Sequence, residues 1–284
     1  MTLRSNTALI LVGSALLALA PRARAESRDF VVYAPGMGGS QQQAKPYLDT
    51  FLRALEKQLG WPSGSASGEY LDDAREFTTY LAGKKPGFGL ISPSMYLSLA
   101  CGKTPVTPLV SAVGSTDVGA VSRFYVVVKS GTANKLEDLK GKRLSSNHLD
   151  DPKFVSRVIF DGKVDAATFF QLQPTSSTVK PFKSIDRGEA DAALVDDDQL
   201  RHMKSLPFGQ SLKVVYESPP LPPYPVVAFD KNVKAPEREA VRKALLSLCS
   251  SKEGAEVCRS ITIKRFEAID PKVWKGALDR YCKQ

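Results

Sequence analysis

The segment from Val214 to Phe229 reads VVYESPPLPPYPVVAF, in which two β-prone runs flank five prolines. Proline has no backbone N–H to donate, and therefore it does not occupy the interior of a central β-strand. Residues 217–225 thus predict a stiff, extended connection between a strand at 212–216 and a strand at 226–229. Such a connection leaves one packed unit and enters another, which indicates a chain of two lobes.

Strands and helices alternate on both sides of this connection. Short apolar runs, such as Phe88–Ile91 and Phe124–Lys129, are typical of buried strands, and the apolar residues of Pro46–Leu59 have helical spacing. Alternation of this kind predicts parallel strands covered by helices. A second crossing between lobes is expected near residues 114–123, which are polar and rich in glycine.

These patterns predict an α/β fold of two lobes, each a mixed, mostly parallel sheet flanked by helices. Lobe 1 would comprise residues 26–120 and 226–284, and lobe 2 would comprise the inserted residues 121–225. Residues 1–25 stand apart from both lobes.

The first 25 residues have the pattern of a secretory signal peptide. Arg4 precedes an apolar run from Ala8 to Ala20, and Ala23-Arg24-Ala25 supplies a small-residue cleavage site. The apolar run is short for a transmembrane helix. We expect cleavage after Ala25 and a mature protein that is periplasmic or secreted; a retained N-terminal anchor is the alternative.

The formal net charge is +9, and three of the basic residues belong to the predicted leader, which leaves +6 on the mature chain. The remaining basic residues are interspersed with acids, as in KLEDLKGKR at 135–143. This pattern is typical of a solvated surface, whereas a nucleic-acid binder carries a dense basic stripe. We therefore expect no nucleic-acid partner.

The chain contains four cysteines, at positions 101, 249, 258 and 282. An even number in an exported protein indicates disulfides, and four cysteines allow three pairings. We favour Cys249–Cys258, which would join two consecutive helices, and this choice leaves Cys101–Cys282 as the second pair. The spacings contain no CxxC and the chain has two histidines, so a metal site is not expected.

A glycine-rich stretch, Gly36-Met37-Gly38-Gly39-Ser40, connects a predicted strand to a predicted helix. A dinucleotide fingerprint requires a third glycine where Gln41 stands, and a P-loop requires Gly-Lys-Ser/Thr. We therefore expect no nucleotide cofactor. Backbone N–H groups at a helix start bind carboxylates, phosphates or carbonyls. Gly38, Gly39 and Ser40 are thus candidate ligand contacts, and a plain tight turn is the alternative.

Five stretches, in chain order, resemble the phosphate/phosphonate type of periplasmic substrate-binding protein of ABC transporters, which has the type 2 periplasmic-binding-protein fold. They are FGLISPSMYLSL (88–99), SRFYVVVKSGTANKLEDLKGKRL (122–144), IDRGEADAALVDDDQL (185–200), VVYESPPLPPYPVVAF (214–229) and REAVRKALLSLCSSKEGAEV (238–257). Many solute-binding families share LEDLKGK, whereas Glu-Ser-Pro-Pro is more specific. The resemblance implies two lobes that close on a ligand at the hinge.

The resemblance also implies ligand contacts. Tyr70 lies near the start of a helix predicted over 70–82, where this family often places an aromatic ligand wall; a core or surface tyrosine is the alternative. Ser92, Ser94 and Tyr96 begin an element that contacts ligand in the family, although the serines are equally suited to cap the helix. Asp196 matches an acid that meets a ligand amino group, and a helix-capping role is its alternative.

One segment departs from the family pattern. After LKGK the family usually carries a Ser-x-Ser-Gly-like turn that holds the ligand's oxyanion, but this chain reads SSNHLDDPKF at 145–154. Asn147 is expected to supply amide donors in place of the missing serines. Asp150 and Asp151 stand where an oxyanion would approach, and like charge is unfavourable there.

The resulting functional hypothesis is a monomeric solute-binding protein that captures a small polar or anionic solute and delivers it to an ABC permease. The alternative is a receptor module of the same fold that signals to a membrane partner. A hydrolase is a third hypothesis: His148 and Asp150 offer a base and an acid, but the chain lacks a G-x-S-x-G elbow. We therefore expect no enzymatic activity.

Overall fold

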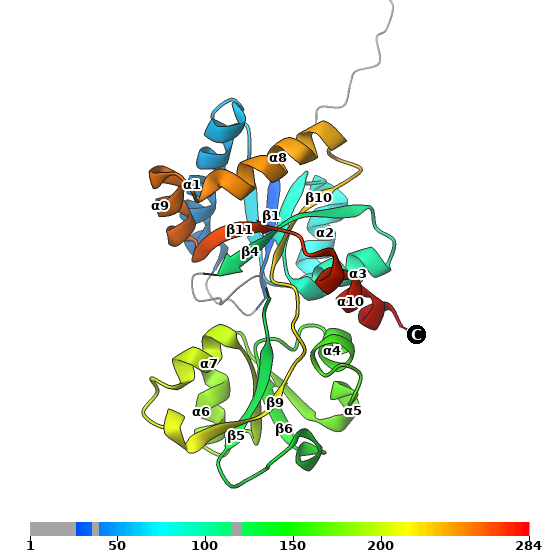
Figure 1. Cartoon of the computed structure of the whole chain (residues 1–284), viewed down its shortest axis with the longest axis vertical. Coiled ribbons are helices and arrows are strands. Elements are labelled where there is room, and N and C mark those ends of the chain that lie inside the picture. The colour runs from blue at the N-terminus through cyan, green and yellow to red at the C-terminus, as the bar shows by residue number, and fades with distance from the viewer. Residues whose placement is uncertain (1–26, 36–39, 115–120, 284) are drawn as a thin grey trace, which may run out of the picture.

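The computed structural model describes residues 27–35, 40–114 and 121–283, which form two lobes (Figure 1). One lobe contains a six-stranded sheet and the other a five-stranded sheet. The predicted leader and residues 36–39, with Gly38 and Gly39, lie outside the described residues. Within the described part, no helix is both long enough and apolar enough to cross a membrane. The assignment of residues 26–120 and 226–284 to one lobe and of residues 121–225 to the other stays a prediction.

The first sheet has the strand order β11-β4-β10-β3-β1-β2. Its strands are β1 (Phe30–Tyr33), β2 (Gly68–Leu71), β3 (Phe88–Ile91), β4 (Val106–Gly114), β10 (Pro225–Phe229) and β11 (Ile263–Ala268). On one face lie α1 (Gln41–Leu59), α8 (Ala235–Leu248) and α9 (Lys252–Ser260) (Figure 1). On the other lie α2 (Ala74–Lys84), α3 (Pro93–Cys101) and α10 (Pro271–Cys282) (Figure 1).

Strand β1 shows why two helical layers are needed. Side chains alternate between the faces of a strand, and here both alternating sets are apolar. Phe30 packs edge-on against Phe51 of α1, while Tyr33 packs against Phe77 of α2 on the opposite face. A strand that is apolar on both faces must be covered on both, and so the sheet forms the centre of the lobe.

Helix α1 ends where its sequence predicts, but it begins at Gln41, five residues before the stretch of helical spacing that starts at Pro46. The Ser40 hydroxyl accepts from the N–H of Gln43, and the Gln43 side chain accepts from the N–H of Ser40, forming a capping box. Gly60 ends the helix in the left-handed conformation, with φ of 66°. Leu52 and Leu55 are fully buried against the sheet.

The second sheet has the strand order β7-β6-β8-β5-β9. Its strands are β5 (Phe124–Lys129), β6 (Arg143–Ser146), β7 (Gln171–Pro174), β8 (Ala192–Asp196) and β9 (Leu212–Glu217). Its α-helices are α4 (Pro152–Phe154), which continues as a π-helical turn over Val155–Ile159, α5 (Ala166–Phe169), α6 (Lys180–Asp186) and α7 (Asp197–Met203). Two short 3₁₀ turns occupy Leu136–Leu139 and Gly209–Ser211.

The sheets are mixed, as expected, but parallel pairing does not dominate. Among the described strands, four pairings are parallel and five are antiparallel. The parallel pairs join strands linked by helices, as in β1–β3 and β6–β8. The strands next to a crossing between lobes, namely β4, β5, β9 and β10, pair antiparallel because they enter or leave each sheet in the opposite direction.

Two extended segments run between the lobes and meet each other (Figure 1). Ser122 and Leu221 form an antiparallel bridge, with N–H···O distances of 2.8 and 2.9 Å in the two directions. The second segment is the proline-rich stretch expected from the sequence, and β10 begins at Pro225. These two hydrogen-bonded crossing segments form the hinge between the lobes.

The C-terminal helix α10 packs on α3 of the first lobe but also contacts the second lobe. The hydroxyl of Tyr281 donates to Asp151 Oδ2 at 2.8 Å, and its backbone carbonyl accepts from Arg157 at 3.3 Å. The ammonium of Lys153 lies 4.2 Å from the centroid of the Tyr281 ring. The last turn of α10 is thus a third link between the lobes.

The region around Tyr70 differs from the expectation. Residues 68–71 form strand β2, an edge strand parallel to β1, and α2 starts only at Ala74. Asp73 caps that helix by accepting from the N–H groups of Arg75 and Glu76. The helix predicted over 70–82 was therefore placed four residues too early, because a four-residue strand leaves too short a pattern to recognise.

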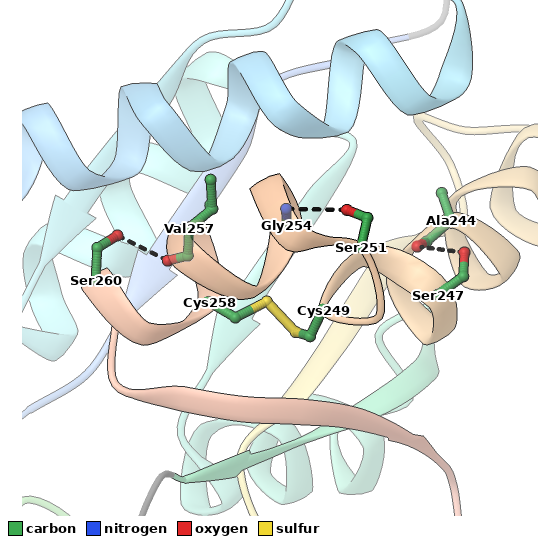
Figure 2. The surroundings of a disulfide bond; sticks show 8 residues. All are labelled: Ala244, Ser247, Cys249, Ser251, Gly254, Val257, Cys258 and Ser260. Atoms are coloured by element: carbon green, nitrogen blue, oxygen red, sulfur yellow. Dashed lines mark hydrogen bonds between the residues drawn. A yellow bond between two sulfur atoms is a disulfide. The ribbon is translucent and has the colours of Figure 1, made fainter.

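Cys249 at the end of α8 and Cys258 in α9 form a disulfide, the pairing that the sequence favoured (Figure 2). It ties together the two helices that cover α1. The second expected pair is not formed, since Cys101 and Cys282 are both thiols. They hydrogen-bond to each other, and burial together with this bond raises the pKa of Cys282 to about 11.

Removal of the disulfide is expected to lower the free energy of unfolding by about 2.5 kcal/mol, because a closed loop of this length restricts the unfolded chain. The measurement is urea unfolding of a Cys249→Ala/Cys258→Ala variant. A Cys101→Ala/Cys282→Ala variant is the control and should lose less. Equal losses in both variants would contradict this prediction.

Candidate functional site

A cavity of about 390 Å³ lies between the lobes. Its polar lining residues are Ser92, Ser94 and Thr262 from the first lobe, Asn147, His148, Asp150, Thr178, Asp196, Asp197, Asp198, Gln199 and His202 from the second, and Ser122 and Tyr224 from the crossing segments. Because both lobes and both crossings contribute, any molecule held here would contact every part of the hinge. Cavities of this volume suit a small metabolite.

Gln199 is the centre of the polar network, and its exposed fraction is 6%. Its Oε1 accepts from the backbone N–H of Asp196 at 3.1 Å, and its Nε2 donates to the carbonyl of Thr178 at 2.8 Å. A backbone N–H can only donate and a carbonyl can only accept, and so the two backbone partners fix the orientation of the amide. The second amide hydrogen reaches Asn147 Oδ1 at 2.8 Å.

This orientation determines one proton on His148. The imidazole Nε2 lies 2.9 Å from Gln199 Oε1, an acceptor, and 3.3 Å from Asp196 Oδ2. Nε2 must therefore carry hydrogen. Burial alone would lower the pKa of His148, but the hydrogen bond and charge of Asp196 and the contact with Gln199 outweigh burial, and the pKa is raised. The edge of the ring meets Phe124, with centroids 5.0 Å apart.

Asp196 has a structural partner for each oxygen that it presents. Its Oδ1 accepts from the N–H of Gln199 at 2.8 Å, which makes it the N-cap of α7, and Oδ2 faces His148. Burial would raise the pKa of Asp196, but the bonds from His148 and from the backbone outweigh it, and the pKa is lowered. The carboxylate is thus ionised and half-exposed at the cavity wall.

Asp150 is the carboxylate that joins the two lobes. Its Oδ2 accepts from Tyr33 of β1 and from Ser94 of α3, both at the long distance of 3.5 Å. The residue is open to the cavity, yet reduced hydration between the lobes raises the pKa of its carboxyl group. No described lysine or arginine lies within ion-pair distance of it.

The first lobe contributes two buried serines. Ser92 caps α3 by accepting from the N–H of Met95 at 3.2 Å, and its hydroxyl lies 2.9 Å from that of Ser94. Ser94 connects this pair to Asp150. The capping role and the cavity-lining role of these serines are therefore both present.

Three other residues predicted to contact ligand lie away from the cavity. Tyr96 is buried in the core, with its ring edge-on to Trp274 at 4.6 Å, because residue 96 faces α10 rather than the other lobe. Ser40 and Tyr70 line a neighbouring, largely apolar cavity of about 360 Å³ between α1 and β11, which shares Leu90 and residues 261–263 with the interlobe cavity. The Tyr70 hydroxyl donates to the carbonyl of Ala34 at 3.3 Å.

Sequence reasoning missed Gln199. It considered His148 as a possible base or ligand contact and placed Asp150 where an oxyanion would approach, but it counted neither among the predicted contacts. A signal for Gln199 was present, because Asp196-Asp197-Asp198-Gln199 has the spacing of a capping box. The aromatic lining was also missed: Phe124, Phe154 and Tyr224 come from three distant segments. Nothing local in their sequences marks them.

A family model described as "ABC transporter, phosphonate, periplasmic substrate-binding protein" matches residues 38–274. The chain belongs to this family. Its members are solute-binding components of ABC uptake systems, and the family places the protein in the periplasm with a small-molecule solute and a permease as partners. A search of curated proteins finds no match.

Solved structures agree with the phosphonate-type fold. The chain superposes on a Xanthomonas citri protein bound to ATP with a TM-score of 0.71, 13% identity and coverage of 90% of this chain and 97% of that one. The binding component of a Pseudomonas aeruginosa ABC phosphonate transporter superposes with a TM-score of 0.65 at 16% identity, with coverage of 89% of this chain and 86% of that one. A Prochlorococcus marinus protein in complex with methylphosphonate superposes with a TM-score of 0.64 at 14% identity, with coverage of 89% of this chain and 96% of that one. At these identities the likeness concerns the fold.

Proposed function

We propose that this substrate-binding protein holds its solute in the interlobe cavity and delivers it to an ABC permease. The observation that carries the proposal is the origin of the cavity wall: hydrogen-bonding groups come from both lobes and from the hinge. A ligand that contacts both lobes stabilises their closed arrangement, and a permease can distinguish closed from open forms.

Within the cavity, Ser92, Ser94, Asn147 and Asp196 are the predicted contacts that line the wall, and we add His148 and Asp150 to them. The Gln199 network supports this assignment, because it fixes the side chains of Asn147 and His148 before a ligand arrives. Groups held in place beforehand cost less entropy on binding. Ser40 and Tyr70, which line the other cavity, are left out of this assignment.

The protein acts without catalysis in this proposal. His148 is engaged by Gln199 and Asp196, and no lining serine hydroxyl hydrogen-bonds to it in the described structure. A nucleophile and its base must lie within hydrogen-bond reach. We further propose a monomer, exported with removal of residues 1–25. Delivery to a permease is favoured over signalling to a sensor, because the family model describes a transport component.

The test is calorimetric titration of the mature protein with a panel that includes phosphate, methylphosphonate, diols and small amines, combined with X-ray scattering to detect closure. An Asn147→Ala variant should lose at least tenfold in affinity for the panel member that binds, because a fixed amide in the wall is removed. The exposed Asn134, in the same lobe, provides an Asn134→Ala control of unchanged affinity. Absence of any binding, with no change in scattering, would count against the proposal.

A further inference from the structure

The lining of the interlobe cavity has more acidic than basic side chains. Among its described lining residues there are four aspartates and two histidines, and none is lysine or arginine. The two internal segments that are not described, 36–39 and 115–120, contain neither lysine nor arginine nor histidine in their sequences. The described lining therefore offers no lysine or arginine to hold an anionic solute, and its basic side chains are the two histidines, of which His148 already faces Asp196.

Helix N-termini are the other usual means of holding an anion, and in the second lobe those of α4 and α7 are capped by carboxylates, whereas α6, which begins after the lining residues Thr178 and Val179, has no side-chain cap. Asp151 accepts from the N–H groups of Lys153 and Phe154 at 3.0 and 3.1 Å at the start of α4. Asp196 does the same for Gln199 at the start of α7. The chain thus places its own carboxylates where an oxyanion would receive backbone N–H bonds.

Three of the four lining aspartates have a charged or hydrogen-bonding partner within the protein. Asp196 faces His148, and Asp198 forms an ion pair with Arg201. Asp197 accepts from the Tyr125 hydroxyl at 2.9 Å and from the N–H of Arg123 at 2.6 Å.

Asp150 differs from the other three. Its bonds to other described side chains are the two 3.5 Å contacts with neutral hydroxyls; its own backbone N–H and the charge of His148 also favour the ionised form, and it is open to the cavity. A carboxylate in this state has free acceptor positions directed at whatever fills the space.

The remaining surface suits the body of an organic cation. Phe124, Phe154 and Tyr224 line the cavity with aromatic carbon, which attracts ammonium and guanidinium groups and their methylenes. Pro222 and Pro223 lie beside Tyr224 and offer no N–H donors. The wall is therefore rich in hydrogen-bond acceptors and apolar surface, and a complementary ligand is rich in donors.

We propose that the solute is a small organic cation, whose ammonium or guanidinium group binds Asp150 and whose hydrocarbon part packs against Phe124 and Phe154. This inference rests on the proposed function, since it names the class of solute for the same cavity. It departs from the anionic solute that the family resemblance suggested.

The test compares ligands that differ in charge. Calorimetry at pH 7.5 would use putrescine, agmatine and choline as cations, 1,4-butanediol as the neutral counterpart of putrescine, and methylphosphonate and phosphate as anions. We expect at least one cation to bind at least 100-fold more tightly than butanediol, and neither anion to bind. Binding of an anion without any cation would overturn the inference and leave the proposed function standing. Binding by none of the six would overturn both.

A variant of Asp150 tests whether this carboxylate binds the cation. Asp150→Asn keeps the shape but removes the charge, and should weaken cation binding at least 50-fold. Asp186→Asn, which removes an exposed charge of the same lobe outside the cavity, should leave affinity unchanged. Equal affinities of Asp150→Asn and the parent protein would overturn the assignment of the cation to Asp150. Thermal unfolding verifies that the variant is folded, and we expect a Tm at or above that of the parent, because an aspartate of raised pKa is less favourable when ionised.

The pH dependence provides a second measurement that needs no variant. The titratable groups facing Asp150 are His148 and Asp151 of its own lobe, Tyr33 of β1 and Tyr224 of the crossing. Ionisation of Asp150 adds attraction for a cation as pH rises through its raised pKa, and deprotonation of His148 removes repulsion at higher pH. Both effects have the same sign, so cation affinity should rise continuously from pH 4 to pH 8. A fall in affinity over this range would contradict the proposal.

Discussion

Replacing Gln199 with leucine is expected to lower the free energy of unfolding by about 3 kcal/mol and to weaken solute binding at least 20-fold. The leucine side chain cannot satisfy the N–H of Asp196, the carbonyl of Thr178 or Asn147 Oδ1, and an unpaired polar group costs about 1–3 kcal/mol when it is buried. Water from the cavity can hydrogen-bond to some of these groups. The expected loss in free energy of unfolding therefore lies at the lower end of the range obtained by adding the three costs.

The binding effect has a separate cause. Without Gln199 Oε1 the His148 ring loses the partner that orients it, and without Gln199 Nε2 the Asn147 amide loses its own. Urea unfolding and calorimetry with the cognate solute measure the two effects. Gln210→Leu is the matched control, because Gln210 is exposed and lies away from the cavity. If both variants were equally stable and bound equally well, the network would have no organising role.

Replacing Gly254 with alanine is expected to cost about 3 kcal/mol or more. A Cβ at this position would lie 1.7 Å from the backbone carbonyl oxygen of Leu248 and 2.9 Å from Ser251 Oγ, the atom that caps α9. Backbone cannot move aside as a flexible side chain does, and the Cys249–Cys258 disulfide holds α8 and α9 together beside the clash (Figure 2). The expected result is separation of these helices or loss of the fold.

The chain offers a matched glycine for comparison. Gly83 lies within α2, and a Cβ there would meet no atom within 4 Å. Gly83→Ala should therefore stabilise the protein by about 0.5–1 kcal/mol through helix propensity and unfolded-state entropy. Urea unfolding of both variants decides the matter, and a Gly254→Ala protein as stable as Gly83→Ala would refute the steric argument.

The two-lobed architecture could be predicted because local sequence patterns indicate it. The prolines of 217–225 exclude a central strand, and the alternation of apolar strands with amphipathic helices defines the lobes. The direction of strand pairing could not be derived in the same way. It depends on which way the chain enters each sheet after a crossing, and that is a property of the whole path rather than of any strand.

The candidate site could be predicted only where its residues border a recognisable element. Ser92, Ser94 and Asp196 stand at helix starts, and their positions in the cavity follow from strand–turn–helix geometry. Tyr96, two residues beyond Ser94, is directed into the core by the turn of the helix. The aromatic wall comes from β5, α4 and a crossing segment, and only the tertiary fold brings these together.

The contacts of α10 with the second lobe have a thermodynamic consequence. The bond from Tyr281 to Asp151 joins the lobes in the arrangement seen here without involving the solute, and therefore it favours this arrangement whether or not solute is present. The apparent dissociation constant equals the intrinsic one divided by the fraction of molecules already competent to bind. A change in the Tyr281–Asp151 bond alters that fraction, and it therefore weakens or strengthens the binding of every solute by the same factor. The C-terminal helix thus sets the overall strength of binding, while the cavity sets the ranking among solutes.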